Sequence, residues 1–359
     1  MGEKKTTGTK RSPPPKAEVV DLFCGVGALS YGLKMAGLKI IAGYDIDGRC
    51  KHAFETNNGG EFFTRDVSKL TAVEIKKHYS GKSKSVLAGC APCQPFSTYK
   101  QRYEEDPQWS LVTKFAKLAV AVLPDFVTME NVPALLNYKK GKVFSDFCRL
   151  LEGAGYHITW SIAKCEEFGV PQKRRRLVVI ASRSKLLKPL QATHLTPVTV
   201  RQAIGKLPRL DAGSADPKDP LHACASLSKL NMKRIKASRP GGTWRDWPTS
   251  LRAECHRRTT GKTYAGVYGR MSWESPSPTM TTQCYGFGNG RFGHPEQDRA
   301  ITLREAAILQ SFPKDYDFVP DGETISFTEV GRWIGNAVPV KLAQAIGHTI
   351  MSSSRGESR

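Results

Sequence analysis

The sequence lacks several features that would place it outside the ordinary globular proteins. No segment approaches the roughly 18 to 20 consecutive apolar residues of a membrane-spanning helix. Its first residues carry charge and proline where a secretory signal needs an apolar stretch, and its nine cysteines are odd in number. We therefore expect reduced thiols in a cytoplasmic setting. No internal repeat is present, which argues against solenoid and propeller architectures.

Acidic residues are scarce. The chain has 33 Asp and Glu against 54 Lys and Arg, a formal net charge of +21 in 359 residues. Solubility does not require so large an imbalance, and it indicates a polyanionic partner, with nucleic acid as the first candidate. A solvated basic surface without such a partner is the alternative that charge alone leaves open.

Strands and helices alternate from residue 18 to residue 182. Runs of aliphatic and β-branched residues predict strands at 18–23, 39–45, 85–89, 125–130, 157–163 and 176–182. Helical periodicity predicts helices at 28–36, which Gly37 ends, and at about 48–56, 110–123 and 142–153. This alternation predicts an α/β fold with a parallel, doubly wound sheet.

Composition divides the chain into parts. Residues 1–17 are rich in Lys, Thr and Pro and predict a disordered basic tail. Residues 18–190 and 331–359 predict one domain, because the helical pattern after Asn336 suits a helix that packs back on the sheet. Residues 191–330 predict a second, irregular domain.

The second domain combines positive charge with aromatic residues. Between Thr193 and Ala300 stand 17 Lys and Arg against 8 Asp and Glu. Six aromatic residues are interleaved with them: Trp244, Trp247, Tyr264, Tyr268, Trp273 and Tyr285. This pattern is typical of a nucleic-acid surface, but the same aromatics can instead form a small core, and both interpretations stay open.

A strand that runs directly into two glycines marks a candidate cofactor cleft. In VVDLFCGVGALS, Gly25 and Gly27 let the backbone approach a ligand at the carboxyl edge of the sheet. Asp45 ends the next strand at a spacing that suits ribose hydroxyls, and Asp66 follows the strand after that. The third glycine of a dinucleotide fingerprint is absent, since Ser30 occupies its place. The cleft therefore favours S-adenosylmethionine over nicotinamide or flavin.

Cys90 and Cys93 form a C-x-x-C directly after the predicted strand at 85–89, on the same sheet edge. A redox pair and half a zinc site are two interpretations of this spacing. Zinc needs a second close pair of ligands, which the Cys and His spacings do not supply, so we expect no metal. A redox motif usually opens a helix, whereas Pro95 and Phe96 follow here at once.

These segments together resemble the DNA cytosine-5 methyltransferase family. Its Pro-Cys-Gln-x-Phe-Ser signature stands at Pro92 to Ser97, and its D-x-F-x-G-x-G turn at Asp21 to Gly27. ENV at 130–132, QKRRR at 172–176 and GNAVP at 335–339 follow in the family's order. The resemblance covers nearly everything from Val19 to Gly347. It implies a Rossmann-like, S-adenosylmethionine-dependent methyltransferase sheet, with residues 191–330 as a smaller target-recognition domain.

The resemblance also implies roles for single residues. Cys93 is the nucleophile that attacks cytosine C6, Glu130 meets the charge that develops at N3, and Arg176, with Arg174 acting more indirectly, holds the ring and orients the thiolate. The expected cofactor-binding residues are Phe23, Cys24, Gly25, Val26, Gly27, Asp45, Ile46, Asp66, Val67, Pro92, Leu111, Asn336 and Ala337. Ile46 stands where the family often has an aromatic residue, so we expect modest cofactor affinity.

A cytosine inside a duplex must be flipped out before this chemistry can occur. The expected DNA-binding residues are Gln94, Ser97, Arg257, Arg258, Arg270, Thr281, Thr282 and Arg291. Thr302 stands 126 positions after Arg176, which leaves room for one recognition domain and hence one target sequence. We expect a monomer that binds double-stranded DNA in the cytoplasm, at the bacterial nucleoid, with a cognate restriction endonuclease as a further partner.

Three alternatives to this assignment differ in substrate or class. A tRNA cytosine-5 methyltransferase shares the same motifs, although the long basic segment favours DNA. A non-catalytic DNA-binding relative commonly loses the nucleophile or the glutamate, and both are present here. Methyltransferases that act on amino groups typically carry an Asp/Asn-Pro-Pro-aromatic motif, and DPQW at 106–109 lacks the second proline.

Overall fold

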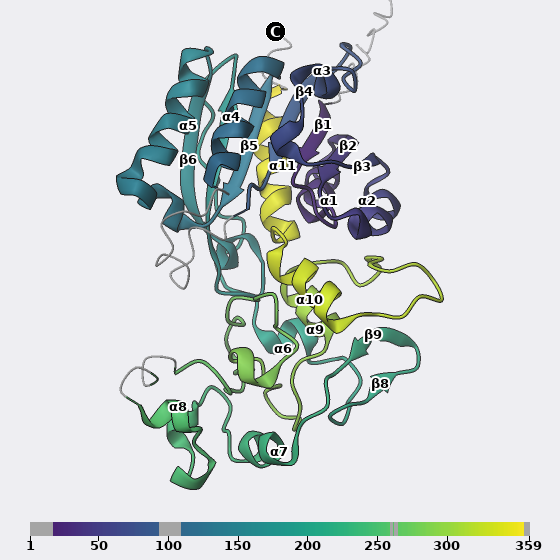
Figure 1. Cartoon of the computed structure of the whole chain (residues 1–359), viewed down its shortest axis with the longest axis vertical. Helices are drawn as coiled ribbons and strands as arrows, with labels where there is room; N and C mark the ends of the chain where they lie inside the picture. The colour runs from purple at the N-terminus through teal and green to yellow at the C-terminus, as the bar shows by residue number, and fades with distance from the viewer. Residues whose placement is uncertain (1–16, 93–108, 259–260, 262–264, 355–359) are drawn as a thin grey trace, which may run out of the picture.

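A seven-stranded sheet forms the centre of the computed structural model, which describes residues 17–92, 109–258, 261 and 265–354 (Figure 1). Its strands are β1 (Ala17–Leu22), β2 (Lys39–Asp45), β3 (Glu61–Thr64), β4 (Lys84–Gly89), β5 (Phe126–Asn131), β6 (His157–Lys164) and β7 (Arg175–Ser182). They lie in the order β3-β2-β1-β4-β5-β7-β6. The chain starts in the middle of the sheet and winds outward in both directions, as the predicted doubly wound fold requires.

Helices cover both faces of the sheet. They are α1 (Ala28–Met35), α2 (Lys51–Asn58) and α11 (Val340–Ser354) on one face, and α3 (Ala72–Lys76), α4 (Ser110–Val122) and α5 (Lys142–Gly153) on the other. Successive strand residues point to opposite faces, so Val19 packs in the first layer and Val20 in the second. All six residues of β1 are buried because helices cover both of its faces. The predicted helices and strands of this part are confirmed to within a few residues.

One prediction about the sheet is wrong. The sheet is not wholly parallel, because β7 runs antiparallel to both of its neighbours, β5 and β6. Only residues 165–174, with the 3-10 turn η7 (Cys165–Phe168), connect β6 to β7. A parallel pair needs a crossover of about a dozen residues or more, usually with a helix, so this short connection dictates a hairpin.

The chain after Ser182 forms short elements that lie below the sheet in Figure 1. They are α6 (Val200–Ile204), β8 (Ala215–Asp216), β9 (Asp219–Ala223), α7 (Lys229–Lys236), α8 (Glu254–Arg257), α9 (Leu303–Leu309) and α10 (Phe327–Asn336). Capping boxes fix where two of these helices begin: Thr199 with Gln202 at α6, and Thr302 with Glu305 at α9. Helix α11 then returns to pack against α1, as predicted.

Two cores stabilise this lower part. The larger is continuous with the core under α1 and α11, and it includes Val200 and Leu303. The smaller core gathers Trp244, Trp247 and Phe287 around Ile235. No helix within the described ranges is long and apolar enough to cross a membrane.

Candidate active site

The carboxyl ends of β1, β2, β3 and β4 meet at one edge of the sheet. Backbone hydrogen bonds continue past the strands there: Cys24 N donates to Tyr44 O at 3.1 Å, Arg65 N to Asp45 O at 2.8 Å, and Cys90 N to Leu22 O at 3.3 Å. The loops that follow all four strands are therefore held side by side. This is the edge at which doubly wound proteins bind their ligands.

The glycine turn after β1 leaves part of its backbone uncovered by side chains. Gly25 and Gly27 both have left-handed backbone angles, with φ of +50° and +86°. A side chain on Gly27 would collide with Asn58 and Phe54 of α2, whereas the space beside Gly25 is empty for 4 Å. Gly25 N donates to Asp45 Oδ2 at 2.8 Å, so the turn and the end of β2 form one unit.

Asp21 is a second carboxyl group at this turn, and it is fully buried. Ser30 Oγ donates to its Oδ2 at 2.7 Å, and its Oδ1 lies buried without a protein hydrogen-bond partner. Burial raises the pKa of Asp21 to about 7, and it also raises the pKa of Asp45. Asp21 was predicted only as part of the D-x-F-x-G-x-G motif, without a role of its own, although its place between a buried strand and the glycines was the available signal.

The other predicted cofactor residues are distributed around the same edge. Ile46 follows Asp45 and is 73% exposed, which is unusual for an isoleucine and leaves a free apolar surface beside the carboxylate. Asp66 caps the turn η2 (Val67–Lys69), which contacts α4, the helix that carries Leu111. Phe23 and Pro92 are half-buried, and Cys24, Val26 and Val67 are buried.

Helix α10 approaches this edge from below and brings Asn336 and Ala337 with it. Arg332 donates to Asp47 Oδ2 at 2.7 Å and Trp333 Nε1 to the same atom at 3.5 Å, two residues beyond Asp45. Asn336 is exposed at the end of α10, and Ala337 is buried directly after it. The link through Asp47 was missed from the sequence, because nothing local relates positions 285 residues apart.

Glu130 is the most enclosed of the predicted catalytic groups that the structure describes, with 3% of its surface exposed. Arg176 Nε lies 2.7 Å from its Oε1, and Cys90 Sγ donates to its Oε2 at 3.0 Å. Glu130 lies near the end of β5, Arg176 at the start of antiparallel β7, and Cys90 just beyond β4. Three neighbouring strands thus bring together a buried carboxyl, a guanidinium and a thiol.

Arg174 is buried and does not reach this carboxyl. Its guanidinium donates to the carbonyl oxygens of Met280 at 2.9 Å, Gly335 at 3.2 Å and Ala337 at 3.4 Å. Arg174 therefore ties QKRRR to the threonine-containing segment and to GNAVP. Through these contacts it positions two segments near the site, and its indirect role in the chemistry stays a prediction.

Thr281 and Thr282, the threonine pair, make a very close backbone contact with the GNAVP segment at 335–339. A Cβ on Gly335 would lie 2.3 Å from the carbonyl carbon of Thr281 and 2.5 Å from Thr282 N, so only glycine fits there. Both threonines are exposed. Gln172 supports the same junction, since its Oε1 accepts from Met280 N at 2.9 Å and its Nε2 donates to Leu309 O at 3.1 Å.

The prediction that Arg270 contacts DNA is wrong. Arg270 is 4% exposed, and its guanidinium donates to the carbonyl oxygens of Ile235, Ser238, His294 and Gln297 and to Asp298. A charged residue so enclosed serves the fold, because burial requires that all its donors be satisfied. Sequence composition does not distinguish such an arginine from a surface one.

The other predicted basic contacts are accessible. Arg257 and Arg258 follow each other at the end of α8, and both are exposed. Arg258 pairs with Glu254 at 2.8 Å, and Arg257 donates to Thr249 O at 3.0 Å. Arg291 is half-buried and donates to Gly241 O.

The aromatic residues of this part largely form a core. Trp244 and Trp247 are 3% and 2% exposed. His256 stacks on Trp244, and Tyr268 meets Trp247 edge to face. For these tryptophans the core interpretation holds, and they offer no free surface for bases. Tyr264 lies outside the described residues.

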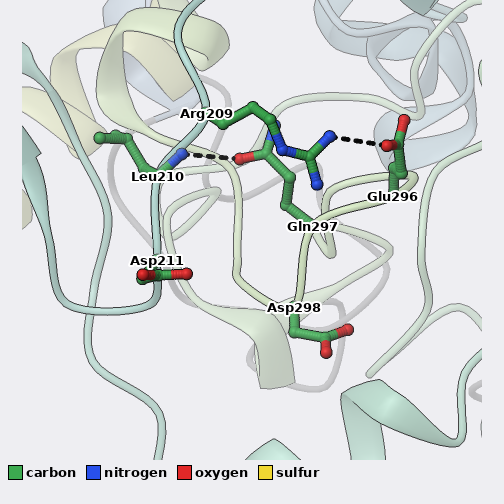
Figure 2. A pocket seen from close by; sticks show the side chains of 6 residues that line it. All are labelled: Arg209, Leu210, Asp211, Glu296, Gln297 and Asp298. Atoms are coloured by element: carbon green, nitrogen blue, oxygen red, sulfur yellow. Dashed lines mark hydrogen bonds and ion pairs between the residues drawn. The ribbon is translucent and has the colours of Figure 1, made fainter.

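A separate polar hollow lies away from the motifs (Figure 2). Its volume is about 320 Å³, and its lining residues are Arg209, Leu210, Asp211, Glu296, Gln297 and Asp298. Arg209 pairs with Glu296 at 2.7 Å, and Leu210 N donates to Gln297 Oε1 at 2.9 Å. The hollow contains none of the predicted site residues.

Cys93, Gln94 and Ser97 lie outside the described residues, which stop at Pro92 and resume at Trp109. The family of the chain is shown by its similarity to known proteins. Residues 17–352 match the family of C-5 cytosine-specific DNA methylases. The chain belongs to this family and is a DNA (cytosine-5-)-methyltransferase.

Individual relatives agree over nearly the whole chain. The sequence is 46% identical over 335 residues to the Type II methylase M.HgiDII of Herpetosiphon aurantiacus. The matched region covers 92% of this chain and 94% of that protein. It is 30% identical over 344 residues to the Type II methyltransferase M.Eco47II of Escherichia coli, covering 93% and 78%. The fold resembles that of the S. pombe Dnmt2 methyltransferase, with a TM-score of 0.61 at 16% identity over 96% of this chain and all of that one.

Proposed function

We propose that this enzyme transfers the methyl group of S-adenosylmethionine to C5 of a flipped-out cytosine in one duplex DNA sequence, through a covalent bond between Cys93 and C6. The observation that carries the proposal is the buried Glu130 carboxyl between Arg176 and Cys90, at the strand end beside the one that leads into Pro92 and Cys93. Such a carboxyl suits a ring nitrogen that must be protonated during attack.

The groups along the strand ends fit S-adenosylmethionine. The buried Asp21 Oδ1 without a protein partner suits an ammonium group, and the open backbone at Gly25 leaves room for the amino-acid end. Asp45 is placed for ribose hydroxyls and Asp66 for the adenine amino group, while the exposed face of Ile46 can cover the ring. When bound, this cofactor supplies an electrophilic methyl group.

The chain's own residues would act in a fixed order. Cys93, as thiolate, adds to C6, and the Glu130 carboxyl places a proton at N3 to meet the charge that the ring gains. C5 then takes the methyl group, and the cofactor would leave as the neutral thioether S-adenosylhomocysteine. Loss of the C5 proton to a water or hydroxide, return of the N3 proton to Glu130 and elimination of the Cys93 thiolate restore the aromatic ring and the enzyme. Arg176 holds Glu130 throughout, through its contact at 2.7 Å.

Residues 191–330 would read the DNA. Flipping costs a few kcal/mol of unstacking and unpairing, which contacts to the backbone and the extrahelical base must offset. Arg257, Arg258 and Arg291 would supply contacts to phosphate or guanine, together with Gln94, Ser97, Thr281 and Thr282 nearer the base. The junction at Gly335 couples the threonine pair to the catalytic domain.

We expect the double substitution Arg257→Gln/Arg258→Gln to weaken duplex binding and to lower the slope of log affinity against log salt concentration by about 2, close to 1 for each lost phosphate contact. Fluorescence anisotropy over a salt series measures this slope. Arg209→Gln is the control, since Arg209 is equally exposed but lies at the polar hollow. An unchanged slope in the double variant would remove these arginines from the interface.

The biological setting follows from the same proposal. The relatives above are named as Type II enzymes, which supports a role as the modification enzyme of a restriction-modification system, or as an orphan relative. We infer a monomer that acts on the bacterial nucleoid, with a cognate restriction endonuclease that cleaves the unmethylated sequence. Methyl incorporation into duplex DNA and into tRNA, compared side by side, tests the substrate: labelling of tRNA alone would refute the proposal.

A further inference from the structure

A thiol outside the signature motif contacts the catalytic carboxyl. Cys90 Sγ donates to Glu130 Oε2 at 3.0 Å, and Cys90 lies three positions before the expected nucleophile. We propose that Cys90 is a positioning residue: its thiol holds Glu130 in the orientation that receives the base. The inference rests on the proposed function, because it deepens the role of Glu130 in that reaction.

Burial explains why Glu130 needs a second donor. The carboxyl is 3% exposed, and Arg176 Nε forms an ion pair with Oε1 at 2.7 Å without the alignment of a hydrogen bond. A buried carboxyl oxygen that lacks a hydrogen bond loses its solvation without compensation and tends to rotate toward any available donor. The thiol donates to Oε2, while the guanidinium lies against Oε1. The two contacts together restrict rotation of the carboxyl group.

The backbone keeps this thiol in register with the carboxyl. Gly89 pairs with Met129 in the parallel ladder of β4 and β5. Just beyond the ladder, Asn131 Nδ2 donates to Ala91 O at 3.1 Å, and Cys90 N donates to Leu22 O at 3.3 Å. Residues 90 and 91 are thus fastened to residues 130 and 131. A contact across two strands fastened in this way is preorganised for catalysis.

A thiol is well suited to such a place because it is a weak donor. The thiol therefore gives up the oxygen at little cost when the base enters. Cys90 can therefore hold Oε2 in the free enzyme and release it to the edge of the flipped cytosine. This role requires neither metal binding nor a redox partner, the two functions that the C-x-x-C spacing first indicated.

The test compares Cys90→Ala and Cys90→Ser in single-turnover methyl transfer to duplex DNA, with kcat and KM measured separately. We expect Cys90→Ala to lower kcat about tenfold with KM for DNA and cofactor unchanged, since one hydrogen bond to the buried carboxyl group is lost. Cys90→Ser keeps a donor and should stay within about threefold of the wild type. Cys148→Ala is the control, because Cys148 is also a half-buried thiol but lies on α5.

A double-mutant cycle separates positioning from general packing. If Cys90 acts through Glu130, Cys90→Ala should lower activity no further in a Glu130→Gln background. Wild-type kcat in Cys90→Ala, or a second tenfold loss in the Glu130→Gln background, would overturn the inference. So would a Cys90→Ser variant that unfolds like the wild type but is as slow as Cys90→Ala. Failure of the wild type itself to methylate C5 in DNA would instead refute the proposed function.

Discussion

Glu130→Gln should lower kcat by about 10² to 10⁴-fold, the range that a positioned general acid contributes. Glutamine preserves the size of the side chain and can still accept from Arg176, so the site should keep its shape. It cannot place a proton at the ring nitrogen when Cys93 attacks. The loss should therefore appear in the chemical step, with KM for DNA and cofactor little changed.

Single-turnover transfer of labelled methyl groups to duplex DNA measures this effect. Glu167→Gln is a matched control, because the Glu167 side chain pairs with Lys164 at 2.9 Å on the surface and is 41% exposed. A Glu130→Gln enzyme with wild-type kcat would show that Arg176 or another group supplies the proton. Equal losses in both variants would indicate a defect in folding.

Arg299→Met should destabilise the protein by about 3 to 5 kcal/mol, as expected when one partner of a buried ion pair is removed. Arg299 and Glu305 are 0% and 1% exposed and form two hydrogen bonds of 2.8 Å. Burial alone would raise the pKa of Glu305, but the hydrogen bonds and charge of Arg299 outweigh it, and the pKa is lowered. Methionine fills the space but leaves the carboxylate without its cation.

Urea unfolding of Arg299→Met beside Arg209→Met gives the comparison. Arg209 also pairs with a glutamate, Glu296, but the two side chains are 71% and 55% exposed, and such pairs contribute at most about 1 kcal/mol. The wild-type contribution of Glu305 should be complete above its ordinary pKa of 4.5 and should be lost as pH falls, because its folded pKa is depressed. Equal destabilisation by the two substitutions would contradict this account.

Local sequence patterns predicted the sheet domain well. The strands of this domain alternate with helices at short range, and Gly37 ends α1 as expected, with a left-handed φ of +97°. The error at β7 arose because the pattern of a buried strand is the same in either direction. The ten residues between Lys164 and Arg175 were the signal that fixed the direction, and they were not weighed.

The part of the chain below the sheet in Figure 1 was harder to predict, because contacts between residues distant in sequence determine its structure. Arg270 and Arg258 both belong to the basic segment between Thr193 and Ala300, yet one is buried among carbonyl oxygens and the other is exposed. Trp244 and Trp247 likewise form a core that depends on residues as distant as Phe287. A single sequence records residue types, and it does not record which of them the fold encloses.

The site was predicted where chemistry requires particular residue types in particular order. Glu130 and Arg176, which the resemblance placed in one site, are in contact, and the glycine turn lies against Asp45. The contacts of Cys90 and Asp47 were not anticipated, because each joins strands or helices that are distant in sequence. The Cys90 contact follows from the sheet order, because β4 and β5 are neighbours, whereas the Asp47 contacts depend on where α10 packs.

The most direct test of the central claim traps the covalent bond. DNA that contains 5-fluorocytosine blocks loss of the C5 substituent, so the enzyme should remain attached after methyl transfer. With S-adenosylmethionine present, we expect the wild type to form an adduct that survives a denaturing gel, and Cys93→Ser to form none. A wild-type enzyme that is folded and binds cofactor, yet forms no adduct on DNA containing many sequences, would contradict the account.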